Sequence, residues 1–222
     1  PKKVLPNGNS PQIKKLTSGY LSELSHCDNL PLLKKILHKI KVANVDTKKG
    51  GFEVAEALLN RCFLTEKKEF TEAIKQALFN LLTLDDNNTQ PDGQVIRYQL
   101  ATMKLKQSPP ELSPELTKLR KDTLEQIKAI NKQRGAAKEW DVKKRLFAIE
   151  KLFLHMYFEL LFGNENVEIL QQVLLKEYKN LSDPQANHLE LLDSVLSVLI
   201  DCSHSLRQIL KELVKILAPN LT

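Results

Sequence analysis

Few residues in this sequence have the types and the spacing that chemistry requires. The segment Asp85–Gln90 carries side-chain oxygens, as a calcium-binding loop does. Its sixth position lacks the required glycine, and its twelfth is Ile96, where such a loop needs a bidentate glutamate. We therefore interpret residues 85–93 as a polar turn. His155 and Glu159, four residues apart on one helical face, could bind a metal or share a proton. With Lys151, however, they form the only polar stripe of an apolar helix, which predicts solvated surface.

The sequence motifs of the common enzyme classes are missing. There is no glycine-rich phosphate loop, no HExxH, no GxSxG and no pair of CxxC motifs. The three cysteines, Cys27, Cys62 and Cys202, are far apart and odd in number, which argues against a zinc site and a disulfide framework and favours a reducing compartment. We expect a protein that is not an enzyme and holds no cofactor or metal.

The formal net charge of +6 is distributed unevenly along the chain. Residues 1–49 and 118–145 carry net charges of +7 and +6, whereas residues 50–117 and 146–222 carry −3 and −4. Separate basic zones suit contact with a polyanion, although solvated helix faces and a flexible basic tail would give the same pattern. The candidate nucleic-acid contacts are the basic residues Lys118, Arg120, Lys121, Lys128, Lys132, Arg134, Lys143, Lys144 and Arg145.

Two further patterns could serve either binding or packing. Leu78, Leu81 and Leu82 form an LxxLL sequence, with which co-regulator helices dock into a hydrophobic groove, so they are candidates for partner binding. The same leucines fit the buried face of a helix over residues 66–84, which we favour. Trp140 precedes the most apolar segment of the chain, and we expect it to be a packing anchor and not a platform for base stacking, because no other aromatic residue is interleaved with the basic residues.

The residues around these candidates predict an all-α fold. Glycine is scarce, at 7 residues, and no segment alternates apolar and polar residues for long, as strands do. No run of 18 apolar residues suggests a membrane span. We expect a flexible basic segment over residues 1–12, an N-terminal helical part over 13–107 and a C-terminal helical part over 114–222. We expect about nine helices, and ten segments show a helical pattern, at about 13–25, around Leu32–Ile40, after the break at Gly50-Gly51, and at about 66–84, 94–106, 114–134, 146–162, 165–180, 187–201 and 204–217. Asn29, Thr65 and Ser113 are candidate caps at helix starts, Gly135 is a candidate interruption, and Gly163 ends the apolar helix.

The expected helices favour a HEAT- or armadillo-like array with diverged repeats. Residues 146–162 are apolar nearly all round, which is typical of a helix surrounded by other helices. Residues 187–201 and 204–217 form a helical hairpin that cannot bury both apolar faces alone, so it must stack on neighbouring helices. No clean period of 40–47 residues is visible. We therefore expect one continuous α-solenoid fragment of a longer protein.

Three successive segments of the C-terminal third form one pattern, Leu192–Ile200, Ser203–Ile209 and Leu217–Thr222. They resemble the leucine-rich helix, the Ser-x-x-Leu-Arg entry and the closing Pro-x-Leu-Thr of the Myb-binding protein / DNA polymerase phi family of nucleolar proteins. The segment Lys151–Gly163 also resembles the helix that precedes them in that family. The resemblance covers residues 146–222 well and the first half of the chain only vaguely.

This resemblance implies a non-enzymatic scaffold in the nucleus and nucleolus. The family acts in ribosome biogenesis, in rRNA processing and rRNA gene transcription, and in transcriptional co-repression; it is not credited with polymerase activity. Implied partners are transcription factors or pre-ribosomal components, DNA or RNA, and the remainder of a longer chain, with no membrane. The family's acidic tracts and basic tail do not occur in this sequence, so their partners cannot be assigned to residues here. The alternative is a helical-repeat transport or cargo adaptor that recognises peptides in a groove.

Overall fold

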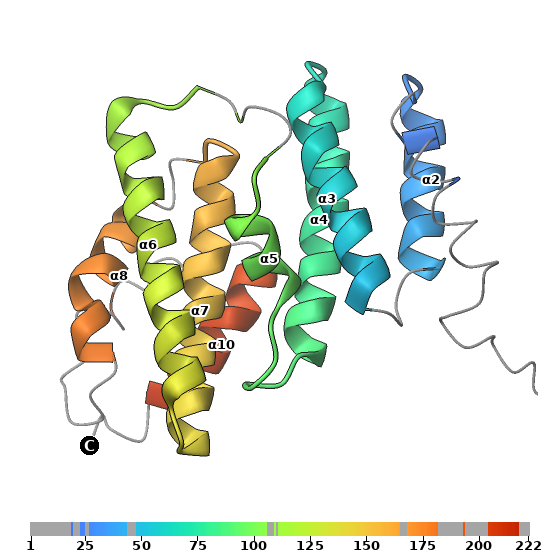
Figure 1. The fold of residues 1–222 in the computed structure, drawn as a ribbon. Coiled ribbons are helices and arrows are strands. Elements are labelled where there is room, and N and C mark those ends of the chain that lie inside the picture. The colour runs from blue at the N-terminus through green and yellow to red at the C-terminus, as the bar shows by residue number, and fades with distance from the viewer. Residues whose placement is uncertain are drawn as a thin grey trace, which may run out of the picture. The chain divides into compact units, whose positions relative to one another are not determined.

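The protein is helical wherever its described residues form regular structure. The computed structural model describes residues 19, 23–24, 27–43, 48–105, 109, 111–164, 168–181, 193 and 204–217. Within these residues the all-α prediction is confirmed, since eight helices and no strand occur (Figure 1). None of the described helices is both long and apolar enough to cross a membrane. The helices are α2 (Leu30–Ala43), α3 (Lys48–Leu64), α4 (Lys68–Asn88), α5 (Ile96–Thr102), α6 (Pro114–Ala136), α7 (Trp140–Leu161), α8 (Glu168–Leu181) and α10 (His204–Leu217).

The chain divides into two compact units. The N-terminal unit comprises residues 1–87 and 103–108, and the C-terminal unit comprises residues 88–102 and 109–222. The division places α5 in the C-terminal unit. The expected flexible segment 1–12 lies outside the described residues, as does nearly all of the expected helices at 13–25 and 187–201.

The N-terminal unit begins its first long described helix where the sequence predicts. Asn29 caps α2, because its side-chain oxygen accepts a hydrogen bond from the backbone N–H of Leu32 at 3.1 Å. The segment before α2 is tied to α3 by Arg61, which donates to the carbonyl oxygen of Cys27 at 3.1 Å and lies 3.7 Å from the carboxylate of Asp28. These contacts hold α2 and α3 together at the start of α2.

The expected break at Gly50-Gly51 is wrong, because α3 runs through both glycines. A glycine in a helix interior costs about 1 kcal/mol relative to alanine. Burial of Val54, Leu58 and Leu59, each at most 1% exposed, stabilises the helix by more than that. Tertiary packing therefore overrides the local signal.

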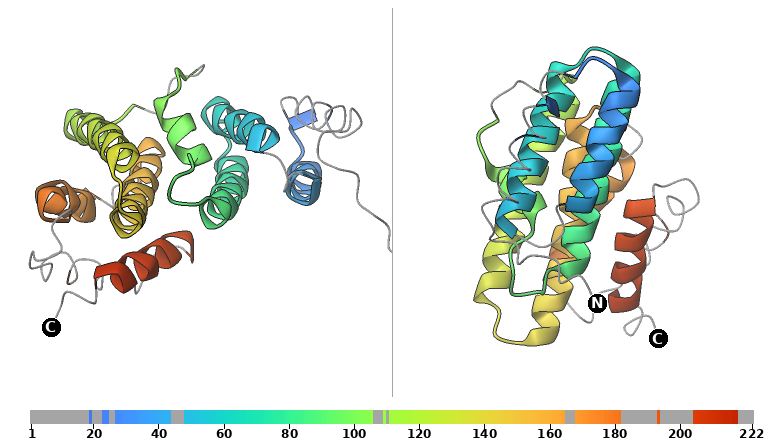
Figure 2. Two further views of the ribbon diagram at one scale, coloured as in Figure 1. Left: turned by 60° about the horizontal axis from the view of Figure 1, so that its bottom comes forward. Right: turned by 90° about the vertical axis from the view of Figure 1, so that its right-hand side faces the viewer.

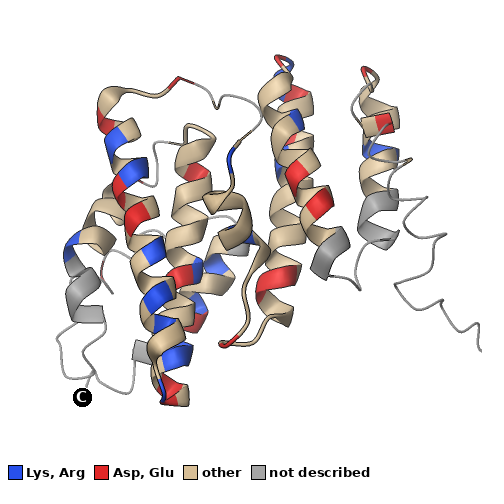
Figure 3. Ribbon diagram, viewed as in Figure 1, with Lys and Arg blue, Asp and Glu red and all other residues tan. Residues whose placement is uncertain are grey.

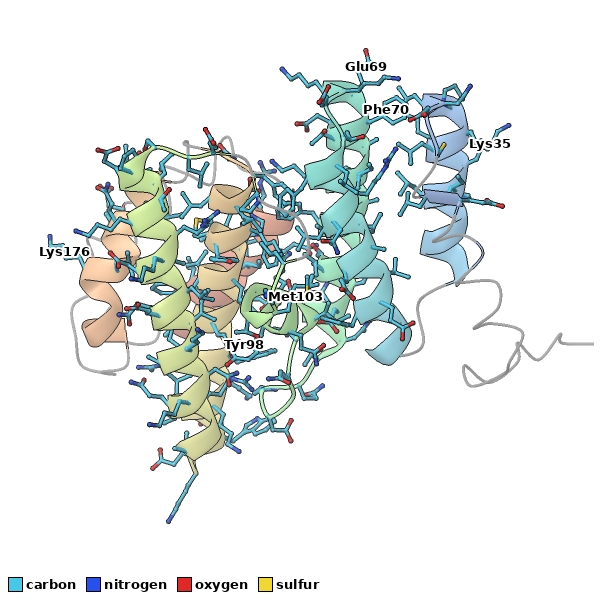
Figure 4. The ribbon with its side chains drawn as sticks, turned by 45° about the horizontal axis from the view of Figure 1, so that its top comes forward. Lys35, Glu69, Phe70, Tyr98, Met103 and Lys176 are labelled. Carbon is cyan, nitrogen blue, oxygen red and sulfur yellow. The ribbon has the colours of Figure 1, made fainter. Side chains whose placement is uncertain are left out.

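The fourth helix is displaced toward the C-terminus from its expected range. Helix α4 begins at Lys68, and Figure 4 labels Glu69 and Phe70 in its first turn. Thr65 does not cap it; its carbonyl oxygen instead accepts a bond from the Thr71 hydroxyl at 3.3 Å. The helix continues to Asn88, so the first four residues of the expected polar turn 85–93 are helical, and the turn itself lies at residues 91–93.

Cys62 of α3 is a buried thiol, and its burial raises its pKa from 9.0 to about 12, with nearby Lys75 opposing and Glu72 reinforcing the shift. The native state therefore keeps this proton at pH values where the unfolded chain loses it. The stability that this group contributes is present below pH 9 and is lost as the pH rises toward 12. Between pH 8 and pH 10 we expect the wild type to lose about 1 kcal/mol of unfolding free energy relative to Cys62→Ala, as measured by urea denaturation. Parallel pH profiles for the two proteins would contradict this.

The C-terminal unit is organised around α7. Every residue from Leu146 to Leu161 is buried, which confirms the expected core helix, although α7 begins six residues earlier, at Trp140. Helix α7 packs against α5, α6, α8 and α10 (Figure 2). Its end at Gly163 is also confirmed: this glycine has a φ of 73°, and the N–H of Asn164 bonds to the Glu159 carbonyl at 2.9 Å.

Helix α6 starts as the sequence predicts. The Ser113 hydroxyl accepts a hydrogen bond from the N–H of Leu116 at 3.2 Å, and Pro114 occupies the first helical position. Gly135 does not interrupt the helix, which ends one residue later. The three residues 137–139 then connect α6 to α7, so the two helices form an antiparallel hairpin (Figure 1).

The polar stripe of α7 is buried, so the prediction of a solvated surface for it is wrong. Lys151, His155 and Glu159 are at most 7% exposed. Helix α10 packs on α7, and its Glu212 accepts a hydrogen bond from the Lys151 ammonium. Within the stripe, His155 Nε2 lies 3.4 Å from Glu159 Oε1, and Asn164 donates to the other carboxylate oxygen at 2.9 Å. Lys151 and Glu159 can be buried here because each has a polar partner, Glu212 of α10 for Lys151 and Asn164 for Glu159.

Candidate nucleic-acid interface

Four of the candidate lysines form one exposed face of α6. Lys118, Lys121, Lys128 and Lys132 are all exposed. At 100° per residue they fall within an arc of about 80°, and at 1.5 Å per residue they extend over about 21 Å along the helix. Glu125 lies on the same face. We call these four residues the lysine face. Figure 3 shows basic residues along α6 and at its junction with α7, with acidic residues interspersed.

Arg134 is not part of this face, so its prediction as an anion contact is wrong. It is 5% exposed, and its guanidinium donates to Glu150 at 2.7 Å and to the carbonyl oxygens of Pro91 and Gly93. It also lies over the ring of Phe147, 5.2 Å from the ring centroid. Arg134 therefore joins α6 to α7 and holds the turn before α5, so its guanidinium makes structural contacts inside the C-terminal unit.

The ion pair of Arg134 and Glu150 lies in a polar cluster inside the C-terminal unit. Asn131 donates a further bond to Glu150 at 2.8 Å. Burial raises the pKa of Glu150, although the charge of Arg134 and the bond from Asn131 oppose the rise. The pKa of Tyr98 on α5, labelled in Figure 4, is raised by its own burial and by Glu150, while Arg134 opposes the rise. The cluster connects α6 to α7 and to the turn before α5 through paired groups, as a structural contact does.

The remaining basic candidates differ in exposure. Arg120 is half-buried and lies close enough to Tyr157 to oppose the rise in pKa that burial imposes on that phenol. Lys143 and Arg145 are half-buried in the first turns of α7. Lys144 is exposed, with its ammonium 3.7 Å from the carboxylate of Asp141. Lys144 thus adds to the accessible cations, whereas Arg120 contributes mainly to the packing of α6 on α7.

The structure adds two residues to the interface. Trp140 is 46% exposed, so the expectation that it anchors the packing is wrong. Lys138, which precedes it in the α6–α7 turn, is exposed as well. The sequence offered a signal for both residues, because they lie between the expected helices at 114–134 and 146–162. Side chains at such a junction extend into solvent.

The LxxLL leucines are part of the interior. Leu78 and Leu82 are fully buried in α4, and Leu81 is half-buried. A docking helix must present its leucines to a partner. The assignment of Leu78, Leu81 and Leu82 to partner binding is therefore corrected: their burial agrees with the packing interpretation.

Metal sites and relatives add no further assignment. Among the described residues, no three or more His, Cys, Asp or Glu side chains are grouped so that they could hold a metal ion. Comparison with known proteins finds no match to this chain among protein-family models, curated proteins or solved structures.

Proposed function

We propose that this chain is part of a non-enzymatic helical scaffold that binds nucleic acid through the lysine face of α6. The observation that carries the proposal is the alignment of Lys118, Lys121, Lys128 and Lys132 on one exposed face. Such a row of ammonium groups follows a phosphate backbone and gains affinity when condensed counterions are released. Burial of Arg134 confines the contact to flexible lysines, which recognise charge and not base sequence.

The proposal extends to the cellular role through the C-terminal resemblance. A nucleolar scaffold of the Myb-binding protein / DNA polymerase phi type would contact RNA or DNA and pre-ribosomal or transcription proteins together. The helical hairpin of α6 and α7, with α8 and α10 packed beside it, is the kind of unit from which diverged HEAT- or armadillo-like arrays are built. We accordingly propose ribosome biogenesis and rRNA transcription as the setting, and a longer protein as the context.

The test is fluorescence anisotropy with labelled RNA and DNA oligonucleotides at two salt concentrations. If four lysines contact phosphates, the logarithm of the binding constant should fall with the logarithm of salt concentration with a slope of about −3 to −4. Reversing all four charges of the lysine face, with K118E, K121E, K128E and K132E, should abolish binding at physiological salt.

The matched control reverses four exposed lysines of the N-terminal unit, K34E, K35E, K68E and K104E. It changes the net charge by the same amount and should leave most of the affinity intact. Equal losses in the two variants would show that only the total charge matters, and would remove the lysine face as a site. Absence of binding even at low salt would overturn the nucleic-acid function and favour a scaffold that binds proteins alone.

A further inference from the structure

The first residue of α7, directly after the α6–α7 turn, is an exposed tryptophan on a hydrogen-bonded support. The N–H of Ala137 bonds to the Gln133 carbonyl at 2.9 Å, and the N–H of Lys143 bonds to the Glu139 carbonyl at 3.1 Å, so both helices are hydrogen-bonded up to the turn. Trp140 comes immediately after the turn and is 46% exposed. Among the described residues it is the one aromatic side chain in the group of exposed large hydrophobics. Its indole ring is thus presented at a fixed place without belonging to the core.

Basic residues flank Trp140 in the sequence. Residues 138–145 contain four basic residues, Lys138, Lys143, Lys144 and Arg145, against the two acids Glu139 and Asp141. The lysine face reaches the same end of the hairpin through Lys132, which lies in the last turns of α6. Trp140 therefore stands where a polyanion that follows the lysine face would arrive.

An indole face and neighbouring cations are complementary to an unpaired nucleotide. A free base stacks on the ring while its phosphates contact the cations, and this combination is typical of surfaces that bind single strands. Inside a duplex both faces of each base are already covered by neighbouring pairs, so only the pairs at its two ends offer the indole a free face. We propose that Trp140 stacks on an unpaired base and makes the tip of the α6–α7 hairpin a single-strand-selective contact. This inference rests on the proposed nucleic-acid function and names its substrate class.

Charge decides between a nucleic acid and the other occupants of this tip. Val142, 40% exposed, is a second exposed apolar side chain in the first turn of α7, and exposed apolar surface alone would equally suit a protein. The basic excess of residues 138–145 is instead complementary to a polyanion, and it continues the charge of the lysine face. A single-stranded nucleic acid uses both the ring and the charges.

The experiment uses intrinsic fluorescence, because Trp140 is the only tryptophan in the chain. Unstructured oligonucleotides of ~12 nucleotides, within the length that one single-strand-binding surface covers, are titrated into the protein beside a duplex of the same length. Stacking should quench the emission with the single strand and much less with the duplex. Trp140→Ala should weaken single-strand binding at least about fivefold, while Trp140→Phe retains part of the affinity.

The controls separate this inference from the function on which it rests. Val142→Ala changes an exposed neighbour and should leave single-strand affinity within about twofold, because burial of its apolar surface is not required. Wild-type affinity in Trp140→Ala, with binding still lost in the lysine-face variant, would overturn the stacking role and leave the proposed function standing. Equal quenching by the duplex, or quenching only by vesicles rich in anionic lipid, would also overturn it. Binding to neither nucleic acid would overturn both.

Discussion

Replacing Glu150 with alanine is expected to lower the free energy of unfolding by about 3–5 kcal/mol. Glu150 is fully buried and bonds to the buried guanidinium of Arg134 at 2.7 Å. Without the carboxylate, Arg134 keeps its charge in an interior where only carbonyl oxygens and an aromatic face remain to solvate it. Removing one member of a buried ion pair destabilises the protein far more than removing both members, because the remaining charge has no partner. Urea denaturation of the variant beside the wild type measures the loss.

The informative control removes both charges together. Arg134→Met with Glu150→Leu replaces the pair by apolar side chains of similar volume, and should cost less than Glu150→Ala alone, because no buried charge is left without its partner. The double variant still loses the bonds from Arg134 to the turn at Pro91 and Gly93, so it should not reach wild-type stability. If the double variant costs as much unfolding free energy as Arg134→Met alone and Glu150→Leu alone added together, the two residues are not a coupled pair.

The features that could be predicted from the sequence are those that neighbouring residues decide. Ser113 and Pro114 start α6, Asn29 starts α2 and Gly163 ends α7 through hydrogen bonds and backbone angles within a few residues. The apolar run at Leu146–Leu161 likewise predicts its own burial, because no solvated face remains on such a helix. Signals of this kind are local and can be read without knowing the fold.

The errors arise where a distant residue supplies the missing partner. The basic zone around Arg134 predicts an anion contact, yet the carboxylate that pairs with it belongs to Glu150, 16 residues away on the next helix. The polar stripe predicts a solvated Lys151, yet Glu212, 61 residues further along the chain, pairs with it. A polar residue within an apolar helix can therefore either lie in solvent or be buried with a polar partner. Only the packing of another helix decides which of the two occurs.

Helix α10 provides the second large prediction, because it covers one side of the core helix. Its Leu206, Ile209, Leu210 and Leu213 are all buried, with Leu210 at 0% exposure. Leu210→Ala should lower the free energy of unfolding by about 2–5 kcal/mol, since it removes apolar contacts and leaves a cavity. Lys211→Ala, at the adjacent exposed position, is the matched control and should change it by less than about 0.5 kcal/mol.

The way in which Leu210→Ala loses stability also follows from the packing of α7. Because every residue from Leu146 to Leu161 is buried, α10 cannot detach without exposing a side of α7 to water. We therefore expect amide hydrogen exchange to accelerate in α7 as well as in α10, and the C-terminal unit to unfold as one cooperative body. Faster exchange confined to α10 would mean that the interface with α7 contributes little. In that case Lys151 and Glu212 would join two elements that open independently, and the core would reside in α5, α6, α7 and α8 alone.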